Sequence, residues 1–306
     1  VTALSIPKTR IQNLNHNKRR YRNNVLLQRS LTALVGIPVI LAFIWLGSPW
    51  LTLLLMAVGV VAIRELYQMT PAEIGPLPVF VGAAWVISFL VGAQAASGRD
   101  NFLVISGGVI ATGSFISLLW FIAYYRAWEP TKINGYVVGF LYLILGPIYV
   151  GFSLATALVL RELTSQGYPD LGRSWLLFAL LVVFAVDTGA YAVGRAIGNH
   201  RLAPNISPNK TWEGSLGGVI SAVVAALILG LLFNLEIAVW KQVTIGAVLG
   251  VVAQWGDLAE SKIKRLANLK DSGSIIPGHG GLLDRLDSIL LAVPAVYYLL
   301  VTVFAP

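Results

Sequence analysis

Apolar runs, most of them long enough to cross a bilayer, alternate with short polar segments along this chain of 306 residues. The hydrocarbon core of a membrane requires a helix of about 17–25 mostly apolar residues. Hydrophobic residues make up 57% of the chain, far more than a soluble domain of this length contains. The sequence therefore predicts an all-α, polytopic integral membrane protein with about nine transmembrane helices. The spans are expected near 31–47, 50–63, 77–93, 102–123, 136–160, 174–194, 214–235, 237–256 and 286–304. The second run is short, which leaves eight or ten spans as alternatives.

The distribution of basic residues predicts the orientation. With a cytoplasmic N-terminus, 18 of the 22 lysines and arginines fall on the cytoplasmic side, as the positive-inside rule requires. Nine spans then place the C-terminus outside. Residues 1–30 are expected to form a basic cytoplasmic tail that contacts anionic lipid. The net charge of +8 is taken to indicate contact with anionic lipid rather than nucleic-acid binding.

Acidic residues distinguish the two halves of the chain. In the first half, Arg64 and Glu65 lie at the predicted end of a span, where charged side chains are normally solvated or reach toward water. Between Asp187 and Asp287, seven of the chain's 14 acids fall on or near the predicted cytoplasmic face. We therefore divide the chain into the tail, N-terminal transmembrane helices at 31–173 and a catalytic transmembrane region with cytoplasmic motif loops at 174–306. No cysteine is present, which excludes disulfides and thiolate nucleophiles.

The segment Ser261–Asp287, SKIKRLANLKDSGSIIPGHGGLLDRLD, concentrates charge in a chain that is only 12% charged. Its lysines and arginines suit phosphate oxygens, and Asp284 and Asp287 can hold a divalent cation that bridges phosphates. Two adjacent glycines, Gly280 and Gly281, permit close backbone approach to a ligand. Taken singly, the two aspartates also fit a helix start favoured by the helix dipole, and the histidine of this segment fits an ordinary loop.

Two further places carry polar groups next to predicted spans. Asp187 interrupts an otherwise apolar span, and an ionisable group in that position is a functional-site hypothesis by default. Its alternative is a buried carboxyl capped by neighbouring hydroxyls. Beyond the predicted span end at 256, Asp257, Ser261 and Lys264 share one helix face, with Glu260 close to it.

The loop between these places, GRAIGNHRLAPNISPNKTWEGSLGG, has no long apolar run. Lys210 followed by Thr211 resembles the end of a P-loop, but the glycines of that motif are missing, so we reject a Walker site. Ser207-Pro208-Asn209 predicts a turn, and Thr211 or Ser215 is expected to cap the next helix. Alone, this loop fits a solvated connector as well as a phosphate clamp.

The combined pattern resembles one family. The segment from Ser261 to Asp287 reads S-x-x-K-R-x(4)-K-D-x-G-x(3)-P-G-H-G-G-x-x-D-R-x-D, which is similar to the signature of phosphatidate cytidylyltransferases, also called CDP-diacylglycerol synthases. The stretches D-T-G-A-Y-x-x-G-R from Asp187 and L-A-P-x-x-S-P-N-K-T-W-E-G from Leu202 to Gly214 resemble that family's other marked regions. The specific resemblance covers roughly 174–306.

The resemblance implies transfer of the cytidylyl group of CTP to phosphatidic acid, which forms CDP-diacylglycerol and pyrophosphate for phospholipid biosynthesis. It also implies Mg²⁺, with room for a second cation. The metal ligands are expected to be Asp257, Asp284, Asp287 and Asp187. The groups expected at the phosphates are Lys210, Lys264, Arg265, Lys270 and Arg285. The remaining substrate-binding residues are expected to be Ser207, Asn209, Ser261, His279, Gly280 and Gly281.

Three alternatives remain. A CTP-dependent polyprenol or phytol kinase would transfer the γ-phosphoryl group to an alcohol and would need a base for the hydroxyl. A related synthase would use an ether-linked lipid. A transporter predicts charges along a midplane path through both halves, whereas the acids gather on one face of the second half. The expected partners are CTP, phosphatidic acid and membrane lipid, with no nucleic acid, and a homodimer is left open. The expected location is a bacterial inner (plasma) membrane, with the active site facing the cytoplasm.

Overall fold

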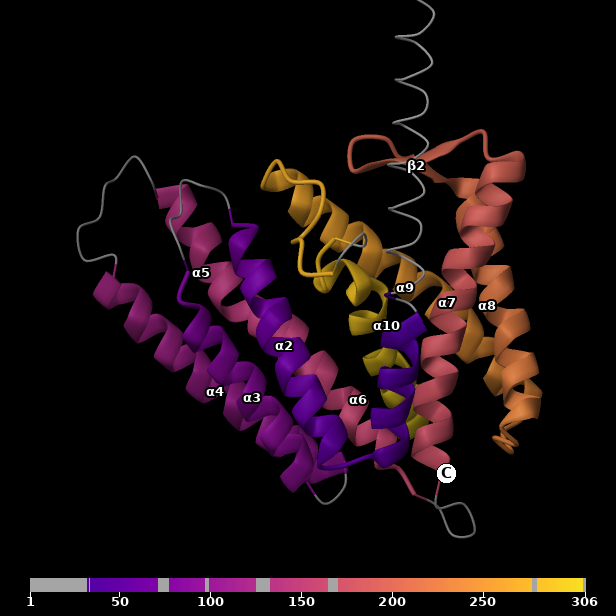
Figure 1. The fold of residues 1–306 in the computed structure, drawn as a ribbon, viewed down its shortest axis with the longest axis horizontal. Helices are drawn as coiled ribbons and strands as arrows, with labels where there is room; N and C mark the ends of the chain where they lie inside the picture. Colours follow the sequence, from indigo (N-terminus) through magenta and orange to yellow (C-terminus); the bar gives the residue numbers. More distant parts are fainter. Residues whose placement is uncertain are drawn as a thin grey trace, which may run out of the picture.

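The computed structural model describes residues 32–304 apart from 33, 71–76, 97–98, 125–132, 165–169 and 277–279. Helices dominate these residues, and they form one bundle (Figure 1). The first described helix is Leu34–Leu46. The elements that follow are α2 (Trp50–Gln68), α3 (Val79–Ala95), α4 (Arg99–Tyr124), α5 (Ile133–Pro147), the π-helix η3 (Ile148–Phe152), α6 (Ser153–Arg161), α7 (Leu171–Ile197), α8 (Trp212–Leu232), α9 (Val239–Leu266), the 3₁₀ turn η4 (Leu283–Arg285), α10 (Asp287–Tyr298) and the π-helix η5 (Leu299–Val303).

Each predicted span coincides with a helix in the described residues. The fifth span corresponds to the consecutive elements α5, η3 and α6, and the π-helical turn η3 begins directly after Pro147. Five helical stretches are long and apolar enough to cross a membrane, namely α2, Asp100–Ala123, Gly135–Arg161, α7 and α8. Shorter apolar helices lie at Leu34–Leu46, Val79–Ala95 and Asp287–Val303. The protein is therefore an all-α integral membrane protein, apart from one small hairpin.

This hairpin corrects the predicted turn. Strand β1 (Arg201–Ala203) pairs antiparallel with β2 (Ser207–Thr211), so Ser207-Pro208-Asn209 belongs to a strand and the turn lies at 204–206. A proline cannot donate to the ladder, but both strands of a two-stranded ribbon are edges, and Pro208 is tolerated there. The turn prediction was therefore wrong by three residues.

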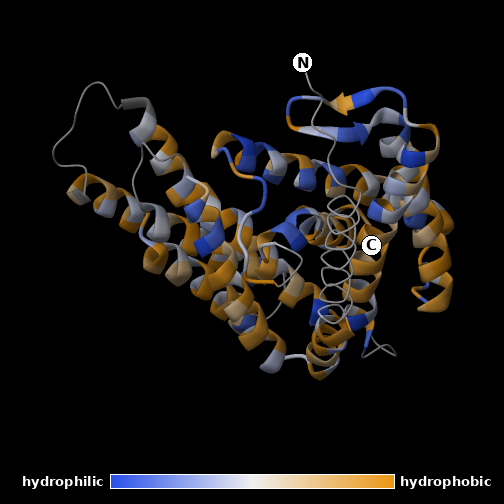
Figure 2. Ribbon diagram, turned by 45° about the horizontal axis from the view of Figure 1, so that its top comes forward, coloured by the Kyte–Doolittle hydropathy of each residue, from blue (hydrophilic) through white to orange (hydrophobic). Residues whose placement is uncertain are grey.

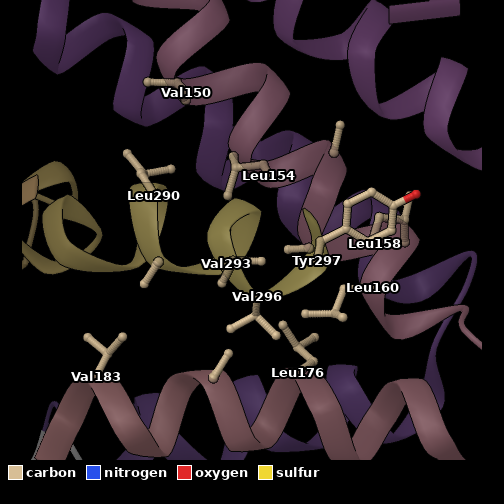
Figure 3. Packing of buried hydrophobic residues seen from close by; sticks show 14 of the residues in the cluster. Val150, Leu154, Leu158, Leu160, Leu176, Val183, Leu290, Val293, Val296 and Tyr297 are labelled. Carbon is tan, nitrogen blue, oxygen red and sulfur yellow. The ribbon is translucent and has the colours of Figure 1, made fainter. Parts of the chain in front are cut away.

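The helix α10 joins the two halves of the bundle. It packs against α6 of the first half and against α7 and α9 of the second (Figure 1). Figure 3 shows Leu290, Val293 and Val296 of α10 between Leu154 of α6 and Val183 of α7. These side chains belong to one buried apolar cluster that extends through both halves. The start of α10 is thereby held in the middle of the molecule.

Candidate active site

Polar elements gather at one end of the bundle. The C-terminal ends of α2, α7 and α9 lie there, together with the hairpin and the loop that leads to α10 (Figure 1). Figure 2 shows hydrophilic residues concentrated on the hairpin and the neighbouring part of α9, whereas the helices below are mostly hydrophobic. The three stretches that the sequence singled out therefore meet at one end of a hydrophobic body.

A cavity of about 460 Å³ opens among α7, the hairpin, α8 and α9. Asp187 of α7, Lys210 of β2 and Asp257 of α9 all line it. The Nζ atom of Lys210 lies 2.6 Å from Oδ2 of Asp257, and both side chains are partly exposed. Asp187 and Lys210 come from two of the motif stretches, and Asp257 lies on the polar face of α9 just before the third. The fold therefore combines in one cavity what the sequence shows as separate signals.

Asp187 differs from Asp257 in that its carboxylate oxygens have no hydrogen-bond or ion-pair partner among the described residues. Asp187 is also exposed. The hydroxyl of the adjacent Thr188 donates instead to the carbonyl of Phe184, 2.9 Å away. The alternative of a buried, hydroxyl-capped aspartate is therefore wrong.

Local hydrogen bonds hold the hairpin over the cavity. Thr211 begins α8 as its N-cap, because its Oγ1 accepts a hydrogen bond from the backbone N–H of Gly214 at 3.1 Å, as predicted. Arg265 donates through Nε to the carbonyl oxygen of Ile206 at 3.2 Å and through Nη1 to that of Leu269 at the same distance. The Arg265 guanidinium thus ties the hairpin to the end of α9.

A second cluster surrounds Asp284 in η4. Its Oδ1 lies 2.6 Å from Nζ of Lys264, and its Oδ2 accepts the backbone N–H groups of Ser272 at 2.9 Å and Gly281 at 2.8 Å. Burial alone would raise the pKa of Asp284, but the hydrogen bonds from Lys264 and the two amides lower it below its usual value. Burial likewise opposes the charge on Lys264, and the bond to Asp284 outweighs it and raises the pKa of Lys264. The pair is therefore charged at neutral pH.

The paired glycines allow this cluster to close. Gly280 has a φ of +84°, in the region that favours glycine, and a Cβ there would lie 2.9 Å from Oδ2 of Asp284. A Cβ at Gly281 would lie 2.7 Å from an oxygen of Glu65. The two glycines accordingly let the carboxylates of Asp284 and Glu65 approach the loop backbone. Their contact with a ligand stays a prediction.

Glu260 and Asp287 meet beside this cluster. Glu260 is 1% exposed, and neither of its carboxyl oxygens finds a hydrogen-bond donor among the described residues, although Oε1 lies 3.5 Å from Nζ of Lys264. Burial, and then the like charge of Asp287, raises the pKa of Glu260. At Gly256 a Cβ would overlap the carbonyl oxygen of Asp287, so the absence of a side chain there lets α10 start directly against α9.

The predicted site residues fall into three groups. Four line the cavity: Asp187, Asn209, Lys210 and Asp257. Four build the second cluster: Lys264, Asp284, Gly280 and Gly281. The others lie around them: Ser261, which donates to Oδ1 of Asp257 at 3.3 Å, Ser207 in β2, Arg265 at the hairpin, Asp287 at the start of α10, and the exposed Lys270 and Arg285. His279 lies outside the described residues.

The four aspartates predicted to hold metal do not form a single centre. Within the described ranges, no three Asp, Glu or His side chains lie close enough to hold a metal ion. Asp187 and Asp257 line the cavity, whereas Asp284 is engaged in the second cluster. Mg²⁺ is commonly bound by one or two carboxylates together with substrate phosphates and water, and the cavity pair fits that mode.

Sequence reasoning missed Glu65, Ser272 and Glu260. Glu65 was expected to be solvated, but it is 1% exposed and accepts hydrogen bonds from the loop before α10. Nothing in one sequence separates a buried carboxylate from one that reaches water at a span end. For Glu260, its place one turn before Lys264 on the polar side of α9 was the available signal.

Comparison with known proteins shows the family of this chain. Residues 27–303 match the model of a family described as "Cytidylyltransferase family". A phosphatidate cytidylyltransferase of Bacillus subtilis is 35% identical over 273 residues, which is 89% of this chain and 97% of that protein. Proteins with the same name from Staphylococcus saprophyticus and Staphylococcus epidermidis are 32% and 30% identical over 90% and 89% of this chain. The fold and site define a membrane-embedded protein with a polar cavity at one end. This chain belongs to the cytidylyltransferase family.

Proposed function

We propose that this protein is an enzyme that transfers the cytidylyl group of CTP to phosphatidic acid and releases pyrophosphate. The product, CDP-diacylglycerol, would serve phospholipid biosynthesis. One observation carries the proposal. A cavity at the polar end of an apolar bundle holds an ammonium group and two carboxylates from three separate segments of the chain. Family membership and the name shared by the similar bacterial proteins support the same activity.

The reaction needs alignment of two polyanions more than it needs an activated nucleophile. An oxygen of the lipid phosphate forms a bond to the α-phosphorus of CTP, and the bond to the β-phosphate breaks, so that pyrophosphate leaves. The attacking phosphate is already an anion near neutral pH, so no serine, cysteine or histidine base is required. Lys210 would bind and orient phosphate oxygens in the cavity, where its present partner is Asp257.

Asp187 and Asp257 are the residues that would hold Mg²⁺, and Asp287 lies next to them through the contact at Gly256. When bound, the ion would neutralise and orient the phosphates. Asp284 fits a different role, because its oxygens already accept hydrogen bonds from Lys264 and two backbone amides. We assign Asp284 and Lys264 to the loop that borders the site. A second cation remains a prediction.

The peripheral residues would contact the nucleotide. Lys270 and Arg285 are exposed at the polar end, where they can reach phosphates that protrude from the cavity. Asn209 lines the cavity beside Lys210 and can donate to a phosphate or the base. Ser207, Ser261, Arg265 and His279 stay proposed substrate-binding residues.

We further propose nine membrane crossings with the polar end in the cytoplasm of a bacterial cell. The excess of 18 of 22 basic residues on one side and a helix at each predicted span support this orientation. CTP would then reach the cavity from the cytoplasm, and the lipid would enter sideways between helices. A homodimer is compatible with this arrangement and remains to be tested.

Two radiolabels test the proposed reaction. Purified protein in detergent is incubated with phosphatidic acid, Mg²⁺ and CTP labelled at either the α- or the γ-phosphate. Cytidylyl transfer moves the α-label into the lipid extract and leaves the γ-label in pyrophosphate. A lipid kinase given an alcohol would instead move the γ-label into lipid and release CDP, and that pattern would replace the proposal.

A matched pair of variants connects the activity to the cavity. Asp257→Asn should abolish lipid labelling, because it removes a cavity carboxylate. Asp170→Asn removes the same charge at the other end of α7, where the carboxylate is 59% exposed and pairs with Arg173. Surface pairs of this kind contribute little, so Asp170→Asn should retain full activity. Full activity in Asp257→Asn would show that the reaction does not depend on this cavity.

A further inference from the structure

A buried carboxylate of the first half of the bundle holds the loop that leads to α10. Glu65 lies in the last turn of α2, and its side chain accepts three hydrogen bonds. Oε1 accepts the backbone N–H of Leu282 at 3.1 Å, and Oε2 accepts the backbone N–H of Leu283 at 2.8 Å and the hydroxyl of Ser272 at 3.1 Å. More than 200 residues separate Glu65 from these partners along the chain.

The loop backbone is shaped around this side chain. Cβ atoms at Gly273 and Gly281 would each crowd a carboxyl oxygen of Glu65, by contacts at 2.5 Å and 2.7 Å. Glu65 is 1% exposed, so water cannot replace the lost partners if the side chain changes. All three of its partners are donors, and a group that donates in its place would leave buried N–H groups unsatisfied.

The connection continues from Glu65 to the site. The hydroxyl of Ser272 donates to Glu65 and accepts from the backbone N–H of Asp284 at 3.3 Å, while the backbone N–H of Ser272 donates to Oδ2 of Asp284. Asp284 in turn holds Lys264 of α9 at 2.6 Å. A chain of hydrogen bonds therefore runs from α2 through the loop to the helix that carries Asp257.

We propose that Glu65 is a positioning residue for the reaction of this enzyme. It fastens Ser272, Leu282 and Leu283 to α2, so that Asp284 and Lys264 stand at a fixed place beside the cavity. The inference rests on the proposed function, because it assigns Glu65 a role in the same site. It also gives α2, whose sequence carries no motif, a part in catalysis beyond anchoring the protein in lipid.

The variant Glu65→Gln tests this role. A glutamine is nearly the same size but turns an NH₂ group toward the N–H of Leu282 or toward the donors on Oε2, so the loop should be released. We expect kcat for CDP-lipid formation to fall between about 10-fold and 100-fold, the range typical of residues that orient a catalytic group. In hydrogen exchange read by mass spectrometry, peptides that contain Leu282 and Leu283 should lose protection, while peptides of α7 and α8 stay unchanged.

The neighbouring Arg64→Gln serves as the control. Arg64 precedes Glu65 on α2 but is exposed, so its change should leave both kcat and the exchange of the loop as in the unmodified protein. Where Glu65→Gln fails to fold, Ser272→Ala replaces it, since this variant keeps the two backbone bonds to Glu65 and removes the hydroxyl that joins Glu65 to the backbone N–H of Asp284. It should show the same two effects, each smaller.

The two readouts separate the possible outcomes. A released loop with unchanged kcat overturns the positioning role, and so does a reduced kcat with a fully protected loop. If the unmodified protein forms no CDP-lipid, the proposed function fails on its own, and exchange alone then decides whether Glu65 fastens the loop. In the double variant Glu65→Gln/Ser272→Ala, strictly additive effects on kcat would also contradict a shared chain of contacts.

Discussion

At the residue scale, the carboxylates of the polar end differ in what they contact, and those contacts separate their roles. Asp187 and Asp257 line a cavity, where the contacts of Asp257 are the side chains of Lys210 and Ser261. Asp284 and Glu65 instead accept hydrogen bonds from backbone N–H groups of the loop. The family resemblance made Asp257, Asp284 and Asp287 the expected metal ligands, together with Asp187. Among these four, the structure favours Asp187 and Asp257 as metal ligands. The oxygens of Asp284 already accept hydrogen bonds from Lys264 and two backbone amides, so few of their lone pairs are available to a cation.

A first prediction separates these roles at Asp257. Magnesium held between a cavity carboxylate and CTP should make each ligand tighten the binding of the other, since both share one coordination sphere. We expect excess chelator to abolish turnover, added Mg²⁺ to restore it, and the reciprocal tightening to disappear in Asp257→Asn. The measurement is a titration of CTP binding at several Mg²⁺ concentrations. Full turnover in chelator would refute a metal at this site.

A second prediction concerns Asp284→Asn. Removal of the charge breaks the pair with Lys264 and places an NH₂ group near two backbone donors, at a side chain that is only 7% exposed. We expect a loss of about 2–3 kcal/mol in stability and at least about tenfold in kcat, but an unchanged Mg²⁺ dependence of CTP binding. Thermal unfolding in detergent and the titration above measure both. Loss of the Mg²⁺ dependence with normal stability would return Asp284 to the metal ligands.

At the scale of elements, helix existence follows from apolar length, but contacts between elements do not. Every predicted span is a helix, because a run of apolar residues in lipid can satisfy its backbone in no other regular way. The continuation of the helix past the apolar run that ends at 256 is also confirmed, since α9 extends to Leu266 and includes Asp257, Ser261 and Lys264. The hairpin was missed because strands of three and five residues are too short to show alternation.

For the site as well, single residues could be predicted from the sequence, whereas contacts between distant residues could not. Lys210, Asp257 and Asp187 were identifiable from motifs because each occupies an unusual chemical setting in its own segment. Glu65 was not, because its significance depends on backbone N–H groups that lie far away along the chain. A local pattern reports what a residue is, and only the fold reports which donors surround it.

The crossing of α9 and α10 yields a third prediction. In Gly256→Ala the new Cβ would overlap the carbonyl oxygen of Asp287, so α10 would have to move away from α9 and carry Asp287 with it. We expect a stability loss of about 1–3 kcal/mol, the usual cost of overpacking, and reduced turnover. The control is Gly107→Ala in α4, where a Cβ meets no atom within 4 Å. Equal thermal midpoints for the two variants would contradict this close packing.

At the scale of the whole molecule, α10 and Glu65 make the two halves one working unit. The predicted division at 173 and 174 follows the motifs, yet the apolar cluster around α10 extends across it, and the loop of the second half rests on α2 of the first. In the proposed reaction CTP comes from water and phosphatidic acid from the membrane, so the polar end has to be joined firmly to the apolar bundle. The first half supplies both apolar helices and, through Glu65 of α2, the acceptor for hydrogen bonds from the loop.

The last prediction concerns orientation. Because the chain contains no cysteine, single cysteines can be introduced and labelled in cells with a maleimide that does not cross membranes. Positions Asn13, Asn205 and Ser274 should be protected in intact cells and react only after the membrane is opened, whereas Ser97 and Gln166 should react from outside. Asn205 and Ser274 carry the most weight, because the bond from Arg265 to Ile206 and the bonds around Ser272 place the hairpin and the loop at the same end of the bundle. Labelling of these two from opposite sides would contradict the fold itself, while labelling of both from outside would keep the fold and reverse the proposed access of CTP.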